Sequence, residues 1–180
     1  MKVSDCPTTQ VEVRIAAAPA EVWSWLLDVD LPARFSTEFQ GGRWVEGAEP
    51  GLGARFRGRN SHPIAGEWET VSTVTGYEPE RLFAWAVMDV TNPAASWHFE
   101  LVPDGDGTIL RQWARIGPGP SNLTTIIGSM PEHEDEIVAM RLGELQANMQ
   151  KTVEGIKALA ESGVPAVTPA CRSAAARREW

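Results

Sequence analysis

The sequence contains few side chains suited to metal or disulfide chemistry. Its 180 residues include 2 cysteines and 3 histidines. Cys6 and Cys171 lie near opposite ends of the chain, and neither has a second Cys or a His nearby at the spacing of a metal site. We therefore expect free thiols and no bound metal.

Long apolar runs and an excess of basic residues are also missing. No stretch approaches the roughly 18 to 20 residues of a membrane-spanning helix, and no apolar block follows Lys2. The 16 Lys and Arg residues face 24 Asp and Glu residues, which gives a formal net charge of -8. Nucleic-acid backbones and anionic membranes repel such a chain. We expect a cytoplasmic monomer or homodimer with no nucleic-acid partner and no membrane insertion.

The sequence does contain enough apolar material for one core. Hydrophobic residues make up 43% and charged residues 22%, as in ordinary globular proteins. We expect a flexible N-terminus at 1–9, one domain at 10–163 and a flexible tail at 164–180. Eight Trp residues stand against one Tyr and five Phe residues. Because indoles are large surfaces that serve both cores and ligand sites, this excess is a first indication of a lined cavity.

Local patterns predict a strand and two short helices near the N-terminus. Residues 11–15 alternate apolar and polar side chains, as in a strand with one buried face. Pro19 suits the first turn of a helix, and apolar residues follow it at helical spacing. A second short helix is expected at 30–39, ended by Gly41 and Gly42.

Between residues 42 and 116 the pattern changes to short runs of β-branched and aromatic residues separated by turn signals. We expect six strands joined by hairpins, and therefore an antiparallel meander. The expected spans are 42–47, 53–61, 66–77, 81–90, 95–103 and 107–116.

Helical spacing returns in the last third of the chain. An apolar stripe with steps of three and four residues predicts a helix over 132–161, about 45 Å long at 1.5 Å per residue. Gly143 and Gly155 lie within it, so we expect a bend or a close contact near them. A short apolar helix at 122–130 is either a lid over a cavity mouth or a packing element.

This order of elements resembles the helix-grip fold of the START-domain and polyketide cyclase/dehydrase superfamily, also called SRPBCC. The resemblance covers residues 10–161 and is carried by the phrases at 18–23, 59–63, 66–70, 77–82, 97–101 and 148–150. It implies an α+β fold in which a seven-stranded curved antiparallel sheet wraps around the long C-terminal helix. It also implies a deep apolar cavity between sheet and helix that holds lipids, polyketides, hormones or other hydrophobic molecules.

Period-two alternation assigns the side chains to the two faces of that sheet. Arg55, Arg57 and Arg59 share one face, and three unpaired arginines do not face an apolar core. The alternate residues therefore point to the concave side. The residues expected on the cavity wall are Phe56, Asn60, His62, Trp68, Thr70, Ser72, Trp85, Trp97, Phe99 and Gln112 from the strands, with Leu145 and Met149 from the long helix.

Among these residues His62 and Asn60 are the candidates for catalysis. A neutral imidazole near pH 7 can both accept and donate a proton, as enolisation, aldol cyclisation and dehydration require. Alternatively the His62 ring only hydrogen-bonds to a carbonyl near the Pro63 turn. Asn60 and Gln112 either orient a ligand carbonyl or phenol, or hydrogen-bond to each other across the strands.

Other motifs favour structural roles. The acidic run at 132–136 is typical of the first turn of a helix, where carboxylates complement the helix dipole. The segment 51–53 lacks the third glycine and the following helix of a dinucleotide-binding loop. We therefore expect neither a metal nor an organic cofactor.

Three functions remain for such a domain. The leading hypothesis is that it binds a hydrophobic, aromatic or polyketide-like small molecule, in the manner of a lipid-transport protein. The enzyme alternative is a cofactor-free cyclase/aromatase or dehydratase, in which the cavity folds a reactive chain and His62 moves the proton. The third possibility is a protein-interaction module with a filled core.

Overall fold

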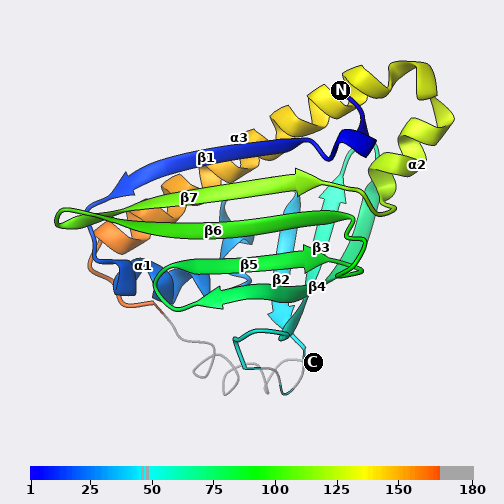
Figure 1. The fold of residues 1–180 in the computed structure, drawn as a ribbon. Coiled ribbons are helices and arrows are strands. Elements are labelled where there is room, and N and C mark those ends of the chain that lie inside the picture. The colour runs from blue at the N-terminus through cyan, green and yellow to red at the C-terminus, as the bar shows by residue number, and fades with distance from the viewer. Residues whose placement is uncertain (46, 48, 167–180) are drawn as a thin grey trace.

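The computed structural model describes residues 1–45, 47 and 49–166 and has the helix-grip architecture expected from the sequence. A curved antiparallel sheet of seven strands wraps around one long helix (Figure 1). The strands are β1 (Thr8–Ile15), β2 (Phe39–Trp44), β3 (Arg55–His62), β4 (Gly66–Glu78), β5 (Leu82–Val87), β6 (Ala95–Asp104) and β7 (Gly107–Ile116). The helices are α1 (Pro19–Leu26), α2 (Asn122–Ser129) and α3 (Glu134–Glu161), with 3-10 turns η1 (Val3–Asp5), η2 (Leu31–Arg34) and η3 (Pro131–His133).

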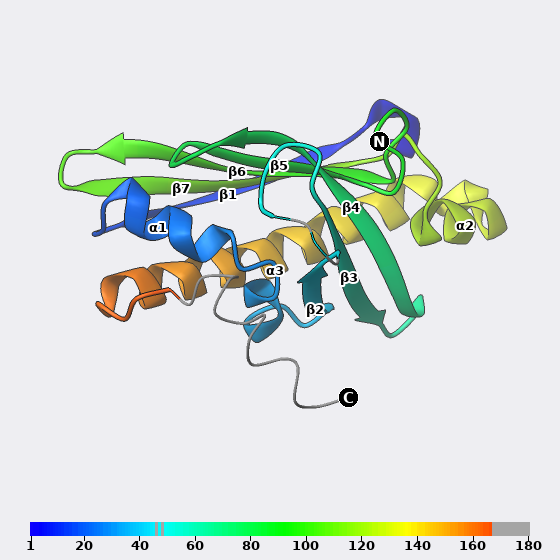
Figure 2. The same cartoon turned by 90° about the horizontal axis from the view of Figure 1, so that it is seen from below.

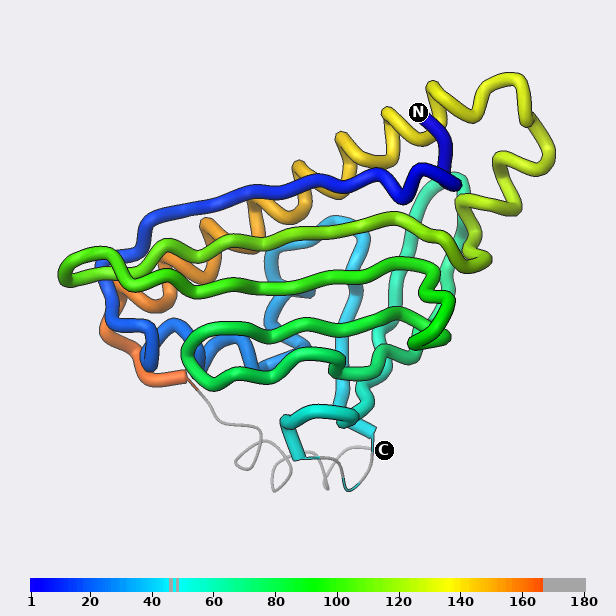
Figure 3. The backbone as a smooth tube through the Cα atoms, viewed as in Figure 1, coloured from blue at the N-terminus to red at the C-terminus, as the bar shows by residue number. Residues whose placement is uncertain are grey.

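The strand order is β1-β7-β6-β5-β4-β3-β2, and every neighbouring pair is antiparallel. From β2 to β7 consecutive strands are neighbours, which confirms the predicted meander. β1 closes the order by pairing with β7, so the first strand of the chain lies beside the last. The tube in Figure 3 shows this path, with the chain returning from β7 through α2 into α3.

Helix α3 crosses the concave side of the sheet. Figure 2 shows the sheet bending around α3, with β1 and β7 above the helix and β3 and β4 turned down along one side of it. The predicted apolar stripe faces the core: the buried residues of α3 include Val138, Leu145, Met149, Val153 and Ile156. Burying this stripe is what holds a helix of 28 residues on the sheet.

The two glycines of α3 have different surroundings. A Cβ on Gly155 would overlap the ring of Phe35, so this glycine allows the close contact that the sequence predicted. A Cβ on Gly143 would meet no atom within 4 Å. The packing of α3 against the η2 segment therefore depends on Gly155.

The second short helix, predicted at 30–39, is present but shorter than predicted. Only η2 (Leu31–Arg34) is helical there, and β2 begins at Phe39. The Ser36 hydroxyl accepts hydrogen bonds from the backbone N–H groups of Glu38 and Phe39, which turns the chain into the strand. Gly42 does not end a helix but lies in β2, where a Cβ would overlap the Val29 carbonyl oxygen.

The first nine residues include the 3-10 turn η1 and the start of β1. β1 begins at Thr8, and Val3 is buried. The Val3 N–H donates to Glu134 Oε1 at 3.0 Å, and the N-terminal amine pairs with Asp135 at 2.9 Å. These carboxylates lie in the first turn of α3, so the acidic run fixes the start of the chain to the start of that helix. Most of the tail expected at 164–180 lies outside the described residues.

No helix in the described part of the chain is both long and apolar enough to cross a membrane.

Candidate functional site

A cavity of about 670 Å³ lies between the concave face of the sheet and α3. Strands β3 to β7 supply most of its wall, and α3 closes the opposite side. The η2 segment and α2 complete the two ends. Every second side chain along a strand points into this space. On β3 the intervening residues include Arg55, Arg57 and Arg59, and they point outward, as predicted from the sequence.

Aromatic rings form the sheet side of the cavity. Trp85 and Trp97 are cross-strand partners on β5 and β6, and their rings stack with centroids 6.2 Å apart and planes 5° apart. Phe56 and Phe99 contact Trp85 at centroid distances of 5.9 and 5.7 Å. Because the strand register brings these rings together, the four residues form one aromatic cluster on the wall.

All the residues that the sequence placed on the wall line this cavity. They are Phe56, Asn60, His62, Trp68, Thr70, Ser72, Trp85, Trp97, Phe99, Gln112, Leu145 and Met149. The prediction of which way these side chains point is therefore supported by the geometry. Their roles in binding or catalysis stay predictions.

The two wall amides do not hydrogen-bond to each other. Asn60 Nδ2 donates to the Gly58 carbonyl oxygen at 3.4 Å. The Gln112 side chain is buried, with 6% of the residue exposed, and its Oε1 has no hydrogen-bond partner among the described residues. The alternative in which Asn60 and Gln112 hydrogen-bond to each other across the strands is therefore wrong.

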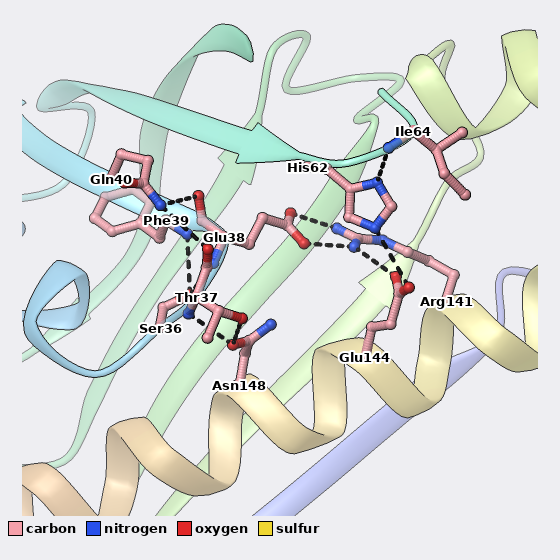
Figure 4. A network of polar contacts seen from close by, with 10 residues as sticks. All are labelled: Ser36, Thr37, Glu38, Phe39, Gln40, His62, Ile64, Arg141, Glu144 and Asn148. Carbon is pink, nitrogen blue, oxygen red and sulfur yellow. Dashed lines mark hydrogen bonds and ion pairs between the residues drawn. The ribbon is translucent and has the colours of Figure 1, made fainter. Parts of the chain in front are cut away.

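His62 lies at the end of β3, facing α3 (Figure 4). Its Nδ1 accepts a hydrogen bond from the Ile64 N–H at 3.2 Å, and its Nε2 lies 3.3 Å from Glu144 Oε1. An Nδ1 that accepts carries no proton, so in this arrangement the ring is neutral and Nε2–H donates to Glu144. The Pro63 turn thus holds the imidazole through a backbone N–H rather than through the expected carbonyl.

Glu144 also belongs to a partly buried ion-pair network with Arg141 and Glu38. The Arg141 guanidinium binds Glu38 through both terminal nitrogens, at 2.5 and 2.6 Å, and reaches Glu144 at 3.2 Å. Burial alone would lower the pKa of Arg141, but its hydrogen bonds and charge interactions with the two carboxylates raise that pKa above its ordinary value. The arginine therefore stays charged and holds the β2 end of the sheet to α3.

A second polar contact lies beside this network. Asn148 Oδ1, on α3, accepts hydrogen bonds from the backbone N–H and the hydroxyl of Thr37, each at 3.0 Å. Neither the Glu38, Arg141 and Glu144 network nor this contact was predicted from the sequence. One signal pointed to Arg141: it lies three residues after Val138 and four before Leu145, on the edge of the buried stripe of α3.

Exposed apolar side chains surround one end of the cavity. Ile64, Met88, Met130 and Met140 line it and are each more than 40% exposed. Helix α2 contributes Leu123 and Ile126 here, and none of its residues is buried. An apolar rim of this kind is compatible with a hydrophobic molecule passing through it.

The described residues contain no group of three or more His, Cys, Asp or Glu side chains arranged to hold a metal ion. The side chains of the acidic run at 132–136 have other partners. His133 pairs with Glu132 and Glu136, and Glu134 and Asp135 bind the N-terminus.

Comparison with known proteins identifies relatives of this architecture. The sequence profile of a family described as "Polyketide cyclase / dehydrase and lipid transport" matches residues 7–161. No curated protein matches the chain. Among solved structures, the polyketide-cyclase-like protein Cgl2372 from Corynebacterium glutamicum has 26% sequence identity and a TM-score of 0.61, over 89% of this chain and 93% of that one.

Two further structures share the fold at lower identity. TTHA0849 from Thermus thermophilus is 16% identical with a TM-score of 0.62, over 87% of this chain and 98% of that one. StfQ, a di-domain ARO/CYC from the steffimycin biosynthetic pathway, is 19% identical with a TM-score of 0.66. The match to StfQ covers 87% of this chain and 52% of that one, so this chain spans about half of StfQ.

Proposed function

The chain belongs to the polyketide cyclase / dehydrase and lipid transport family, and on that premise we propose that it binds a hydrophobic, ring-containing small molecule in the cavity between sheet and α3. The observation that carries this proposal is the aromatic-walled cavity of about 670 Å³. Ligand pockets commonly have volumes of about 300 to 1,000 Å³, mostly apolar walls and a few polar groups.

The composition of the wall supports a flat, apolar ligand. The stacked pair Trp85 and Trp97 offers ring faces and edges to a second aromatic system, with Phe56 and Phe99 beside them. Apolar surface moved from water into such a space gains roughly 25 cal/mol per Å² before the costs of association are subtracted. The few polar groups on the wall then orient the ligand.

The test is calorimetric titration with naphthalene, combined with mass spectrometry of any compound that copurifies. Asn60→Trp places a large side chain in the cavity and is expected to weaken naphthalene binding roughly tenfold or more, because the wall loses the space that the ligand needs. Ser61→Trp is the matched control, since the next residue of a strand points to the other face. Equal affinities for the two variants, or no binding by the natural chain, would contradict the proposal.

The second candidate function is a cyclase or dehydratase that uses His62. It is supported by the family description, which includes polyketide cyclases and dehydrases. The Nε2–H of His62 can donate to a ligand carbonyl if it leaves Glu144, whereas Nδ1 is occupied by the Ile64 N–H. This arrangement suits a proton donor better than a general base. His62→Gln is then expected to keep naphthalene affinity and to abolish turnover of a polyketide substrate; unchanged turnover would remove this role.

The interaction module with a filled core, the third possibility, receives no support from a cavity of this size.

A further inference from the structure

Gln112 is a buried amide whose oxygen lacks a hydrogen bond among the described residues. It lies in the middle of β7, opposite Phe99 on β6 and Val11 on β1. Both neighbours are apolar, so neither side chain can offer a hydrogen to Gln112 Oε1. A buried polar group without a partner is costly, and native proteins keep few of them.

The cavity is the place from which a partner can reach this amide, because Gln112 is part of the cavity wall. The last torsion of a glutamine side chain is broad, so the amide group turns at little cost and can present its oxygen to the cavity. A ligand carbonyl would bind only the amide nitrogen and would leave Oε1 unsatisfied. A ligand hydroxyl or N–H group satisfies the oxygen directly.

The charged groups on the wall restrict the ligand further. Among the described residues, Arg141 is the one Lys or Arg that lines the cavity, and Glu38 lies beside it on the same wall. The Arg141 guanidinium is already bound by Glu38 and Glu144, so it offers no unneutralised charge to a ligand carboxylate. Two carboxylates around one guanidinium leave this cluster with a net negative charge, which opposes an anionic ligand in a site of low dielectric constant.

We propose that Gln112 determines specificity, by accepting a hydrogen bond from the hydroxyl or N–H group of an uncharged aromatic ligand. This inference rests on the proposed binding function and adds two properties of the ligand: it is a hydrogen-bond donor at the end that reaches β7, and it carries no carboxylate.

The test compares four probes that share one ring system: naphthalene, 2-naphthol, 2-methoxynaphthalene and 2-naphthoate, each titrated calorimetrically at pH 7. The natural chain is expected to bind 2-naphthol roughly 10- to 100-fold more tightly than its methyl ether, the range that one satisfied buried acceptor provides. It is expected to bind 2-naphthoate most weakly. In Gln112→Met, which keeps nearly the same volume, the preference for 2-naphthol over the ether is expected to disappear.

Three results would overturn the inference while leaving the binding function intact. They are equal affinities of the natural chain for 2-naphthol and the ether, a preference for 2-naphthol that survives in Gln112→Met, and tighter binding of 2-naphthoate than of 2-naphthol. Failure of all four probes to bind would instead overturn the binding function itself. If Gln112→Met does not fold, the probe comparison on the natural chain still decides, with Gln112→Leu as the second variant.

Discussion

His98 lies on the face of the sheet opposite to the cavity, where its ring stacks on Trp113 with centroids 4.8 Å apart and planes 16° apart. Burial lowers the pKa of His98 below its ordinary value of 6.5, and the charge of Glu100 offsets part of this effect. As pH falls below 6.5, the unfolded chain binds a proton on this residue before the folded chain does. The stability associated with a neutral His98 is therefore present above pH 6.5 and is lost as pH falls through the lower pKa of the folded state.

The expected outcome is that His98→Phe weakens the pH dependence of unfolding. Phenylalanine keeps an aromatic ring against Trp113 but does not titrate. Urea unfolding followed at about pH 8 and at about pH 5 should show a smaller loss of stability on acidification for the variant than for the natural chain. Parallel losses in the two proteins would show that His98 does not contribute to acid sensitivity.

The direction of individual side chains was predicted correctly where it depended only on the two-residue alternation of a strand. The arginines of β3 fixed which face is outward, and this placed His62 and Asn60 on the cavity wall. Contacts between residues far apart in the sequence were not predicted. Arg141 and Glu38 are separated by 103 positions, and no local pattern indicates that their side chains form a pair.

At the scale of elements, the Arg141 network is the main polar link between the β2 end of the sheet and α3. The side chains of Arg141 and Glu38 are 20% and 14% exposed, so both charges lie largely outside bulk water. Removing one partner of such a pair leaves the other charge buried and uncompensated. The link therefore stabilises the closed arrangement of sheet and helix only while both members are present.

Arg141→Met is expected to lower the free energy of unfolding by about 3 kcal/mol, because Glu38 loses its partner. Adding Glu38→Leu should recover most of the lost free energy of unfolding, because both charges of the pair are then absent. Arg57→Met is the control: the Arg57–Glu69 pair is exposed on both sides, so its loss should cost about 1 kcal/mol or less. Urea unfolding is measured for these three variants and for Glu38→Leu alone, and strictly additive effects of the Arg141 and Glu38 changes would contradict the interpretation.

Most elements were predictable from the sequence, and the errors have identifiable causes. Long periodic segments gave the meander of β2 to β7 and the α3 helix correctly to within a few residues. The second short helix was predicted too long because Gly41 and Gly42 were interpreted as the residues that end it. They belong instead to a strand that passes too close to Val29 for a side chain at Gly42, which only the tertiary structure reveals.

At the scale of the whole molecule, the sheet and α3 enclose the cavity from opposite sides. Its N-terminus binds the start of α3, and β1 pairs with β7, so the N-terminal segment is held to both the helix and the sheet. The presence of a hollow followed from the family resemblance, but its volume did not. The space left between packed side chains depends on their three-dimensional fit, which periodicity along the sequence does not encode.

Because that hollow exists only in the folded chain, a ligand that occupies it should raise the melting temperature by mass action. At a ligand concentration about 100 times the dissociation constant, the added stability is about 2.7 kcal/mol. For a domain of this size this corresponds to a rise of about 5 to 10 °C in Tm.

The measurement is scanning calorimetry with increasing 2-naphthol. Tm should climb with the logarithm of ligand concentration, and it should climb less for Asn60→Trp than for Ser61→Trp, because only the former reduces the cavity. A ligand that binds at room temperature yet leaves Tm unchanged at every concentration would have to bind the folded and unfolded chains alike. In that case the aromatic wall between sheet and helix would not be the binding site.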